Sequence, residues 1–104
     1  LANKKDGIYI VYSVCEDAMK GGVENELVIS KVTDKTIYLR VTVSKNAKCV
    51  FSYSLDGKKY EGIKSEFQAR PGRWVGAKMG LFATRTSTIN DAGYADFDWF
   101  RIGK

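Results

Sequence analysis

Apolar and polar side chains alternate along this chain with a period of two, and this pattern constrains the fold more than any other feature. The alternation is cleanest over residues 36–44, where every odd position is isoleucine, leucine or valine and the even positions carry threonine, tyrosine, arginine and serine. Successive side chains of a strand point to opposite faces of its sheet. The segment is therefore predicted to be a strand with one buried face and one solvated face.

Further strand patterns follow one another along the chain, and no segment has the 3.6-residue period and the caps of a helix. Segment 8–15 is apolar on both faces, so we expect it to be central in its sheet. Asp56-Gly57 predicts a tight hairpin turn, and Gly62 predicts a bulge in the return strand. The predicted strands are residues 8–15, 27–32, 36–44, 49–53, 59–67, 74–83 and 94–102. Together they predict an all-β, antiparallel sandwich or barrel.

Length, composition and charge narrow the class of protein. With 104 residues, the chain has room for a single domain, which we place at residues 1–104. No apolar run approaches the roughly 20 residues that span a bilayer. The 17 Lys and Arg residues outnumber the 12 Asp and Glu residues, but they are scattered and form no basic block. We therefore expect neither a membrane partner nor a nucleic-acid partner.

The residues offer little catalytic chemistry. The chain contains no histidine, which excludes serine–histidine and cysteine–histidine nucleophiles, and it has no P-loop. Asp96 and Asp98 lie two positions apart on one predicted strand, about 7 Å from each other on the same face. The carboxylates of a glycosidase need a similar separation, but they also need a cleft that gives them two different environments. We therefore assign no catalytic residue.

The same two carboxylates leave two other interpretations open, a solvated strand edge and a calcium site. Calcium prefers hard oxygen ligands, and the loop before the strand adds a third carboxylate. The candidate metal ligands are Asp91, Asp96 and Asp98. Calcium is the one candidate cofactor.

Two cysteines, Cys15 and Cys49, lie on different predicted strands. A disulfide between them requires those strands to be neighbours, and small buried thiols are the alternative interpretation. Two thiols without any histidine do not make a structural zinc site. The sequence leaves the pairing of the cysteines open.

Aromatic side chains are candidates for a sugar-binding surface, because their rings offer flat faces to sugar rings. Tyr38 and Arg40 alternate with apolar residues and belong to the solvated face of their strand. The alternative role for this face is cross-strand pairing that stiffens the sheet. Trp99 lies beside two phenylalanines, so we expect it to pack in the core. The candidate ligand-binding residues are Tyr38, Arg40, Trp74 and Tyr94.

Three blocks of sequence carry a resemblance to a known family. IYLRVTVSKNAKCVFSYSLDGKKY, GRWVGAKMGLFA and GYADFDWFRI follow in this order and cover most of residues 37–102. They resemble the C-terminal concanavalin A-like β-sandwich of glycoside hydrolase family 43, which contains β-xylosidases and α-L-arabinofuranosidases. The resemblance implies a jelly-roll sandwich beside a β-propeller that holds the catalytic carboxylates. The chain is similar to the second half of that sandwich, so we expect an incomplete sandwich.

The resemblance also implies a function, a non-catalytic accessory domain of a glycosidase that acts on xylan- or arabinan-derived sugars and is secreted or periplasmic. The expected partner is the catalytic β-propeller of the parent enzyme, and a second copy of the chain is another source of the missing strands. Buried apolar residues would support the parent through stability; they are Leu39, Val41, Phe51, Tyr53, Leu81 and Phe97. Two other functions stay open, a free-standing module that binds an oligosaccharide and an immunoglobulin-like interaction module, although the Cys…Trp…Cys core spacing of the latter is missing.

Overall fold

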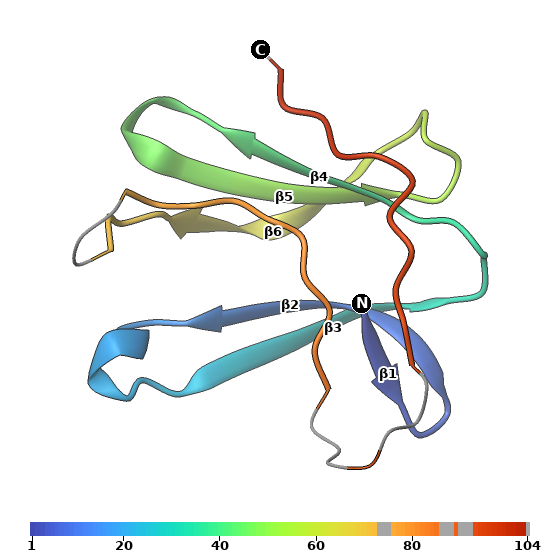
Figure 1. Cartoon of the computed structure of the whole chain (residues 1–104). Helices are drawn as coiled ribbons and strands as arrows, with labels where there is room; N and C mark the ends of the chain where they lie inside the picture. Colours follow the sequence, from blue (N-terminus) through green and yellow to red (C-terminus); the bar gives the residue numbers. More distant parts are fainter. Residues whose placement is uncertain (73–75, 86–88, 90–92, 104) are drawn as a thin grey trace. The chain divides into compact units, whose positions relative to one another are not determined.

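The computed structural model describes residues 1–72, 76–85, 89 and 93–103. Their contacts divide the chain into two compact units, Leu1–Arg70 and Pro71–Lys104. The first unit contains two three-stranded antiparallel sheets, each with its strands in chain order (Figure 1). The all-β, antiparallel fold predicted from the alternation is therefore confirmed.

The first sheet, which we call sheet A, has β2 as its central strand. Its strands are β1 (Ala2–Lys4), β2 (Gly7–Cys15) and β3 (Glu24–Val32). The central position of β2 was predicted from its two apolar faces, and Ile10 near its middle is only 3% exposed. β3 begins three residues earlier than predicted, because the polar residues 24–26 pair with the end of β2. Their polarity hid this extension from a search for alternation.

The second sheet, sheet B, has β5 as its central strand. Its strands are β4 (Tyr38–Val43), β5 (Lys48–Ser54) and β6 (Glu61–Gln68). Leu39 lies opposite Tyr53 and Val41 lies opposite Phe51, so the apolar positions of the two strands share one face. The pairing of β5 with β6 is irregular between Gly62 and Glu66, which confirms the bulge predicted near Gly62.

Two short 3-10 turns occupy loops that the sequence had predicted. They are η1 (Ala18–Lys20), between β2 and β3, and η2 (Lys45–Ala47), between β4 and β5. Neither extends into an α-helix. In the part of the chain that the structure describes, no helix is long and apolar enough to cross a lipid bilayer.

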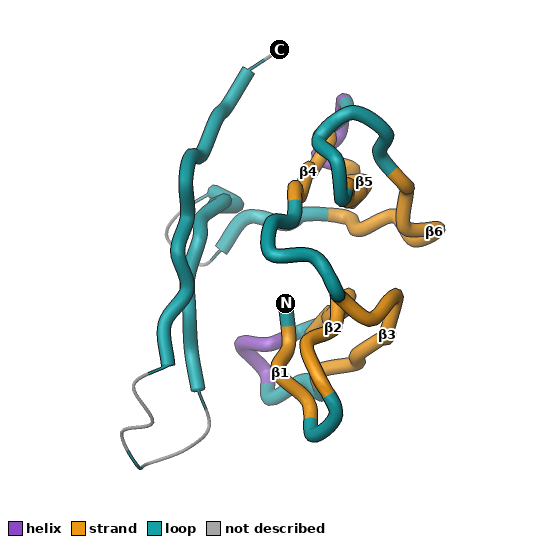
Figure 2. Tube along the Cα trace, turned by 90° about the vertical axis from the view of Figure 1, so that its right-hand side faces the viewer, coloured by secondary structure: helices purple, strands orange, loops and turns teal. Residues whose placement is uncertain are grey.

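The apolar faces of the two sheets contact each other through aromatic rings. The ring centroids of Tyr12 on β2 and Phe51 on β5 are 5.6 Å apart, and the ring planes are tilted by 59°. Figure 2 shows the backbone of the strands of both sheets in orange and the loops that join them in teal. Tilted aromatic pairs are favourable because the positive edge of one ring meets the negative face of the other. Around this contact the core is small: among the described residues, the buried apolar side chains are those of Ile10, Cys49 and Tyr53.

Three of the six apolar residues that were predicted to support the parent are not buried. Leu39 is 58% exposed, although it lies on the apolar face of its sheet. β4 is an edge strand, so Leu39 has a neighbouring strand on one flank only. Leu81 and Phe97 in the second unit are 46% and 52% exposed. Val41 and Phe51 are half-buried and Tyr53 is buried, so the prediction holds best on the central strand β5.

The second unit differs most from the prediction. Its described segments, residues 76–85 and 93–103, have no regular secondary structure, so the predicted strands 74–83 and 94–102 are wrong for the residues described. A strand needs a partner with which to exchange backbone hydrogen bonds, and these segments form no ladder. Trp99 is 58% exposed, with the Cζ atom of Arg101 at 5.4 Å from its ring centroid. Its predicted core packing is wrong, because no sheet face of this unit is described that could cover it.

Candidate functional site

The face of sheet B that points away from its apolar side brings two of the predicted site residues together. We call it the outer face. Tyr38 and Arg40 both lie on β4 and alternate with the apolar positions, as predicted. The side chain of Arg40 is exposed, and its Cζ atom lies 3.6 Å from the ring centroid of Tyr60. This distance is well inside the range of about 6 Å in which a guanidinium is attracted to an aromatic face. We call this pair the Arg40–Tyr60 stack.

Small residues between the strands explain how Arg40 reaches Tyr60. Arg40 lies opposite Ser52 on β5, and Ser52 lies opposite Gly62 on β6. Tyr60 comes two residues before Gly62, so the arginine side chain crosses the central strand diagonally over short neighbours. A side-chain carbon added to Gly62 would meet no atom within 4 Å. The outer face is therefore open above Gly62, beside the stack.

Tyr38 packs on the turn that joins β5 to β6. A side-chain carbon added to Gly57 would lie 2.9 Å from the ring of Tyr38, closer than van der Waals contact. Gly57 also has a φ of +74°, a left-handed conformation that residues with a side chain rarely adopt. The glycine in the predicted Asp56-Gly57 turn is thus required twice, by its backbone conformation and by the tyrosine above it.

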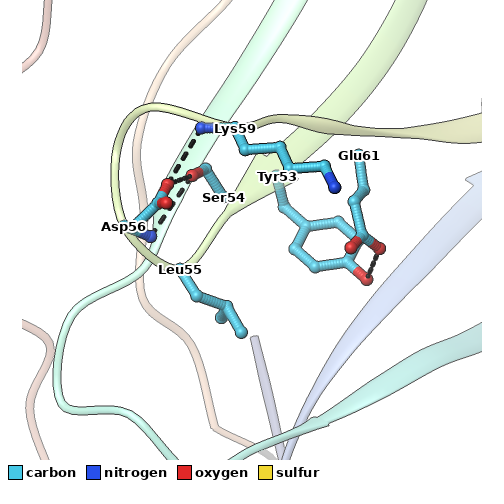
Figure 3. Close-up of a pocket in the computed structure, with 6 residues that line it drawn as sticks. All are labelled: Tyr53, Ser54, Leu55, Asp56, Lys59 and Glu61. Atoms are coloured by element: carbon cyan, nitrogen blue, oxygen red, sulfur yellow. Dashed lines mark hydrogen bonds between the residues drawn. The ribbon is translucent and has the colours of Figure 1, made fainter.

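The carboxylate of Asp56 holds the same turn together (Figure 3). Its Oδ1 atom accepts hydrogen bonds from the backbone N–H of Lys58 at 2.8 Å, from the N–H of Lys59 at 2.9 Å and from the Ser54 hydroxyl at 2.9 Å. The N–H of Gly57 donates to the Ser54 oxygen at 2.9 Å. The two backbone donors, followed by the Ser54 hydroxyl, lower the pKa of Asp56, because they stabilise its charged form.

A hollow lies beside the turn, next to the buried end of β5. Its lining consists of Tyr53, Ser54, Leu55, Asp56, Lys59 and Glu61 (Figure 3). The hydroxyl of Tyr53 donates a 2.9 Å hydrogen bond to Oε2 of Glu61, and this bond raises the pKa of Tyr53. The volume is about 160 Å³, below the roughly 300–1,000 Å³ of typical ligand sites. Both carboxylates of its lining, Asp56 and Glu61, accept hydrogen bonds from groups of the same hairpin.

The other predicted ligand-binding residues lie elsewhere in the chain. Tyr94 belongs to the second unit and is 85% exposed. Trp74 lies outside the described residues, so its predicted role stays a prediction. Tyr38 and Arg40 are thus the two members of the predicted set that the structure places on one face. Tyr60 completes that face, and only the strand register shows that it lies within reach of Arg40.

The predicted calcium site also stays a prediction. Asp96 and Asp98 lie in the second unit, and Asp91 lies outside the described residues. Among the residues that are described, no group of three or more carboxylates or thiols could hold a metal ion. Cys15 and Cys49 are free thiols, the first half-buried and the second buried, which agrees with the alternative to a disulfide.

Comparisons with known proteins agree with the resemblance found in the sequence. The family model described as "Beta xylosidase C-terminal Concanavalin A-like domain", from glycoside hydrolase family 43, matches residues 1–103. A protein named "Beta-xylosidase" from Formosa agariphila is 34% identical over 70 residues, which are 67% of this chain and 11% of that protein. The chain thus spans about a tenth of the length of this relative. No solved structure matches the chain.

Proposed function

The chain belongs to the family of β-xylosidase C-terminal concanavalin A-like domains of glycoside hydrolase family 43, and we propose from this premise that it serves a larger glycosidase without catalysing hydrolysis itself. The antiparallel, all-β structure agrees with the concanavalin A-like sandwich of the family. We propose that the parent acts on xylan- or arabinan-derived sugars and that its catalytic β-propeller is the partner of this chain. Secretion or a periplasmic location of the parent is part of the same proposal.

One observation carries the proposal most directly: the match to a C-terminal, concanavalin A-like domain spans residues 1–103. The two carboxylates that line the hollow are held by hydrogen bonds within the chain. Asp56 is fixed in a turn by three donors, and Glu61 accepts the hydroxyl of Tyr53. Both carboxylates line a hollow that is too small for a sugar chain. Their contacts favour a structural role for both carboxylates.

We propose that the domain acts by bracing the catalytic domain, and a pair of matched variants in the intact parent glycosidase tests this. Ile10 is 3% exposed, and Ile8 on the same face of β2 is 46% exposed. Ile10→Ala opens a cavity in the small core, whereas Ile8→Ala removes a partly solvated side chain. Ile10→Ala should lower the temperature at which aryl-xyloside hydrolysis is lost, and it should leave kcat/KM at low temperature close to that of the parent. Ile8→Ala should change neither quantity appreciably.

The chain by itself provides the complementary measurement. It should hydrolyse neither aryl β-D-xylopyranosides nor aryl α-L-arabinofuranosides, while the intact parent should hydrolyse at least one of them. The ratio of the two rates in the parent decides between xylosidase and arabinofuranosidase activity. Hydrolysis by the chain alone, or full thermal resistance of a parent that lacks residues 1–104, contradicts the accessory role.

A further inference from the structure

Arg40 is an exposed cation that contacts an aromatic ring, and no carboxylate of the described residues pairs with it. None of the ion pairs between described residues includes Arg40. Its guanidinium instead lies 3.6 Å from the ring centroid of Tyr60. This contact holds the group over the ring, and no hydrogen bond between described residues uses its N–H groups. A side chain that is already ordered loses less conformational freedom when a ligand binds.

The surface next to the stack is open and is bordered by a second ring. Gly62 has free space above its Cα atom, and Ser52 beside it is small. On the same face, the ring of Tyr38 lies on Gly57, so its position is fixed by the turn. The outer face therefore presents a fixed cation, an open floor and an ordered aromatic ring, all carried by one sheet.

We propose that the Arg40–Tyr60 stack binds the carboxylate of a uronic acid carried by a xylo-oligosaccharide. A planar guanidinium donates two parallel N–H bonds to a carboxylate, a geometry that a lysine ammonium does not reproduce. The net charge of +5 favours an acidic ligand over a basic one. The open floor over Gly62 admits the sugar ring, and Tyr38 limits its position on one flank. The inference depends on the proposed function only for the choice of xylose as the sugar.

Titration of the full 104-residue chain with matched oligosaccharides tests the site. The probes are xylotriose, xylotriose carrying one 4-O-methylglucuronate, and tetraglutamate as a carboxylate without sugar. Isothermal calorimetry gives the dissociation constants, and amide chemical shifts of residues 38–62 locate the ligand. The glucuronate-bearing probe should bind at least about tenfold more tightly than xylotriose, which is the effect of a charge-assisted hydrogen-bonded pair.

Four variants separate the site from general charge. Arg40→Gln should weaken binding of the acidic probe at least about tenfold, and Arg40→Lys should recover only part of the loss. Gly62→Val should also block binding, because its side chain fills the open floor, and the backbone of Gly62 requires no left-handed φ. The matched control is Lys35→Gln, which removes the same charge from the exposed loop between β3 and β4 and should leave the affinity unchanged.

The outcomes decide between a sugar site and its alternatives. Selective binding of the glucuronate probe that is lost in Arg40→Gln and in Gly62→Val supports the proposal. The proposal is overturned if xylotriose binds as tightly as the glucuronate probe, or if either variant keeps its full affinity. It is also overturned if tetraglutamate binds equally tightly, and the ligand would then be a carboxylate of a protein. A parent enzyme that fails to hydrolyse xylosides while the chain still binds the acidic probe overturns the proposed function alone.

Discussion

The hydroxyl of Tyr53 donates a 2.9 Å hydrogen bond to the carboxylate of Glu61, directly across the β5–β6 pair. Tyr53 is one of the few buried apolar side chains of the first unit, and the bond satisfies its polar end at the edge of the core. The same bond raises the pKa of Tyr53, because it stabilises the protonated hydroxyl. Stability and titration of this residue are therefore linked.

We expect Tyr53→Phe to lower the free energy of unfolding by about 1 kcal/mol at neutral pH, the net value of one hydrogen bond. A phenol whose pKa is higher in the folded state than in the unfolded state stabilises the fold while it is protonated. This contribution is present below the ordinary pKa of 10.0 and is lost as the pH rises through the higher folded value. Urea titrations of both proteins should show their difference shrinking above pH 10.0. A difference that grows with pH would contradict this assignment.

The sequence predicted the first unit better than the second, for a physical reason. The alternation in β4 and β5 and the Asp56-Gly57 turn are local signals, because successive side chains or a single backbone conformation determine them. The predicted strand 94–102 shows a similar pattern, but a strand also needs a partner, and the partner is a non-local property. The predicted burial of Leu39 was wrong for the same reason. A period of two shows which face of a strand is apolar, but it does not show which strand lies at the edge of the sheet.

The candidate site was predicted only in part. The alternation placed Tyr38 and Arg40 on the solvated face, because both occupy even positions of a strand with apolar odd positions. The stack on Tyr60 depends on the register of β5 with β6, which shifts between Gly62 and Glu66. Neither the register nor its shift can be read from one strand alone. Loop length and the turn signal constrain a hairpin register, but a bulge shifts it by residues that no local pattern specifies.

The turn glycine gives a second prediction. Gly57→Ala should lower the free energy of unfolding by about 1–3 kcal/mol, because the left-handed φ is strained for alanine and the new methyl group meets the Tyr38 ring. Gly62→Ala is the matched control and should cost nothing or stabilise slightly, since it has open space and no positive φ. Repeating Gly57→Ala in a Tyr38→Ala background should reduce its cost. If Gly57→Ala lowers the free energy of unfolding by the same amount in that background, backbone strain explains the whole loss and the Tyr38 ring contributes nothing to it.

The contact between the sheets gives a third prediction. Tyr12 and Phe51 join β2 to β5 at a ring-centroid distance of 5.6 Å. A double-mutant cycle of Tyr12→Leu and Phe51→Leu should yield a coupling of about 1 kcal/mol in unfolding experiments, the usual value for an aromatic pair. The control is a second cycle, of Tyr9→Leu with Phe51→Leu. Tyr9 points to the other face of β2, and its hydroxyl donates a hydrogen bond to Asp6. Coupling between Tyr9 and Phe51 as large as that of the Tyr12 cycle would mean that the sheets do not meet through these rings.

The carboxylate that holds the β5–β6 turn gives a fourth prediction, which concerns acid. The backbone N–H groups of Lys58 and Lys59 lower the pKa of Asp56 below its ordinary value of 3.8. A carboxylate whose pKa is lower in the folded state stabilises the fold above its unfolded pKa, and this contribution is lost as the pH falls through the folded value. Asp56→Ala should therefore lower the melting temperature at neutral pH, and the difference from the unchanged chain should disappear as the pH falls below 3.8.

Asp34→Ala serves as the control, because Asp34 is an exposed carboxylate in the β3–β4 loop. This substitution should have little effect at either pH. Equal melting temperatures of the Asp56→Ala variant and the unchanged chain at neutral pH would show that the three hydrogen bonds do not hold the turn. In that case the positions of Gly57 and of the Tyr38 ring on it would have to be set by the strands rather than by the turn.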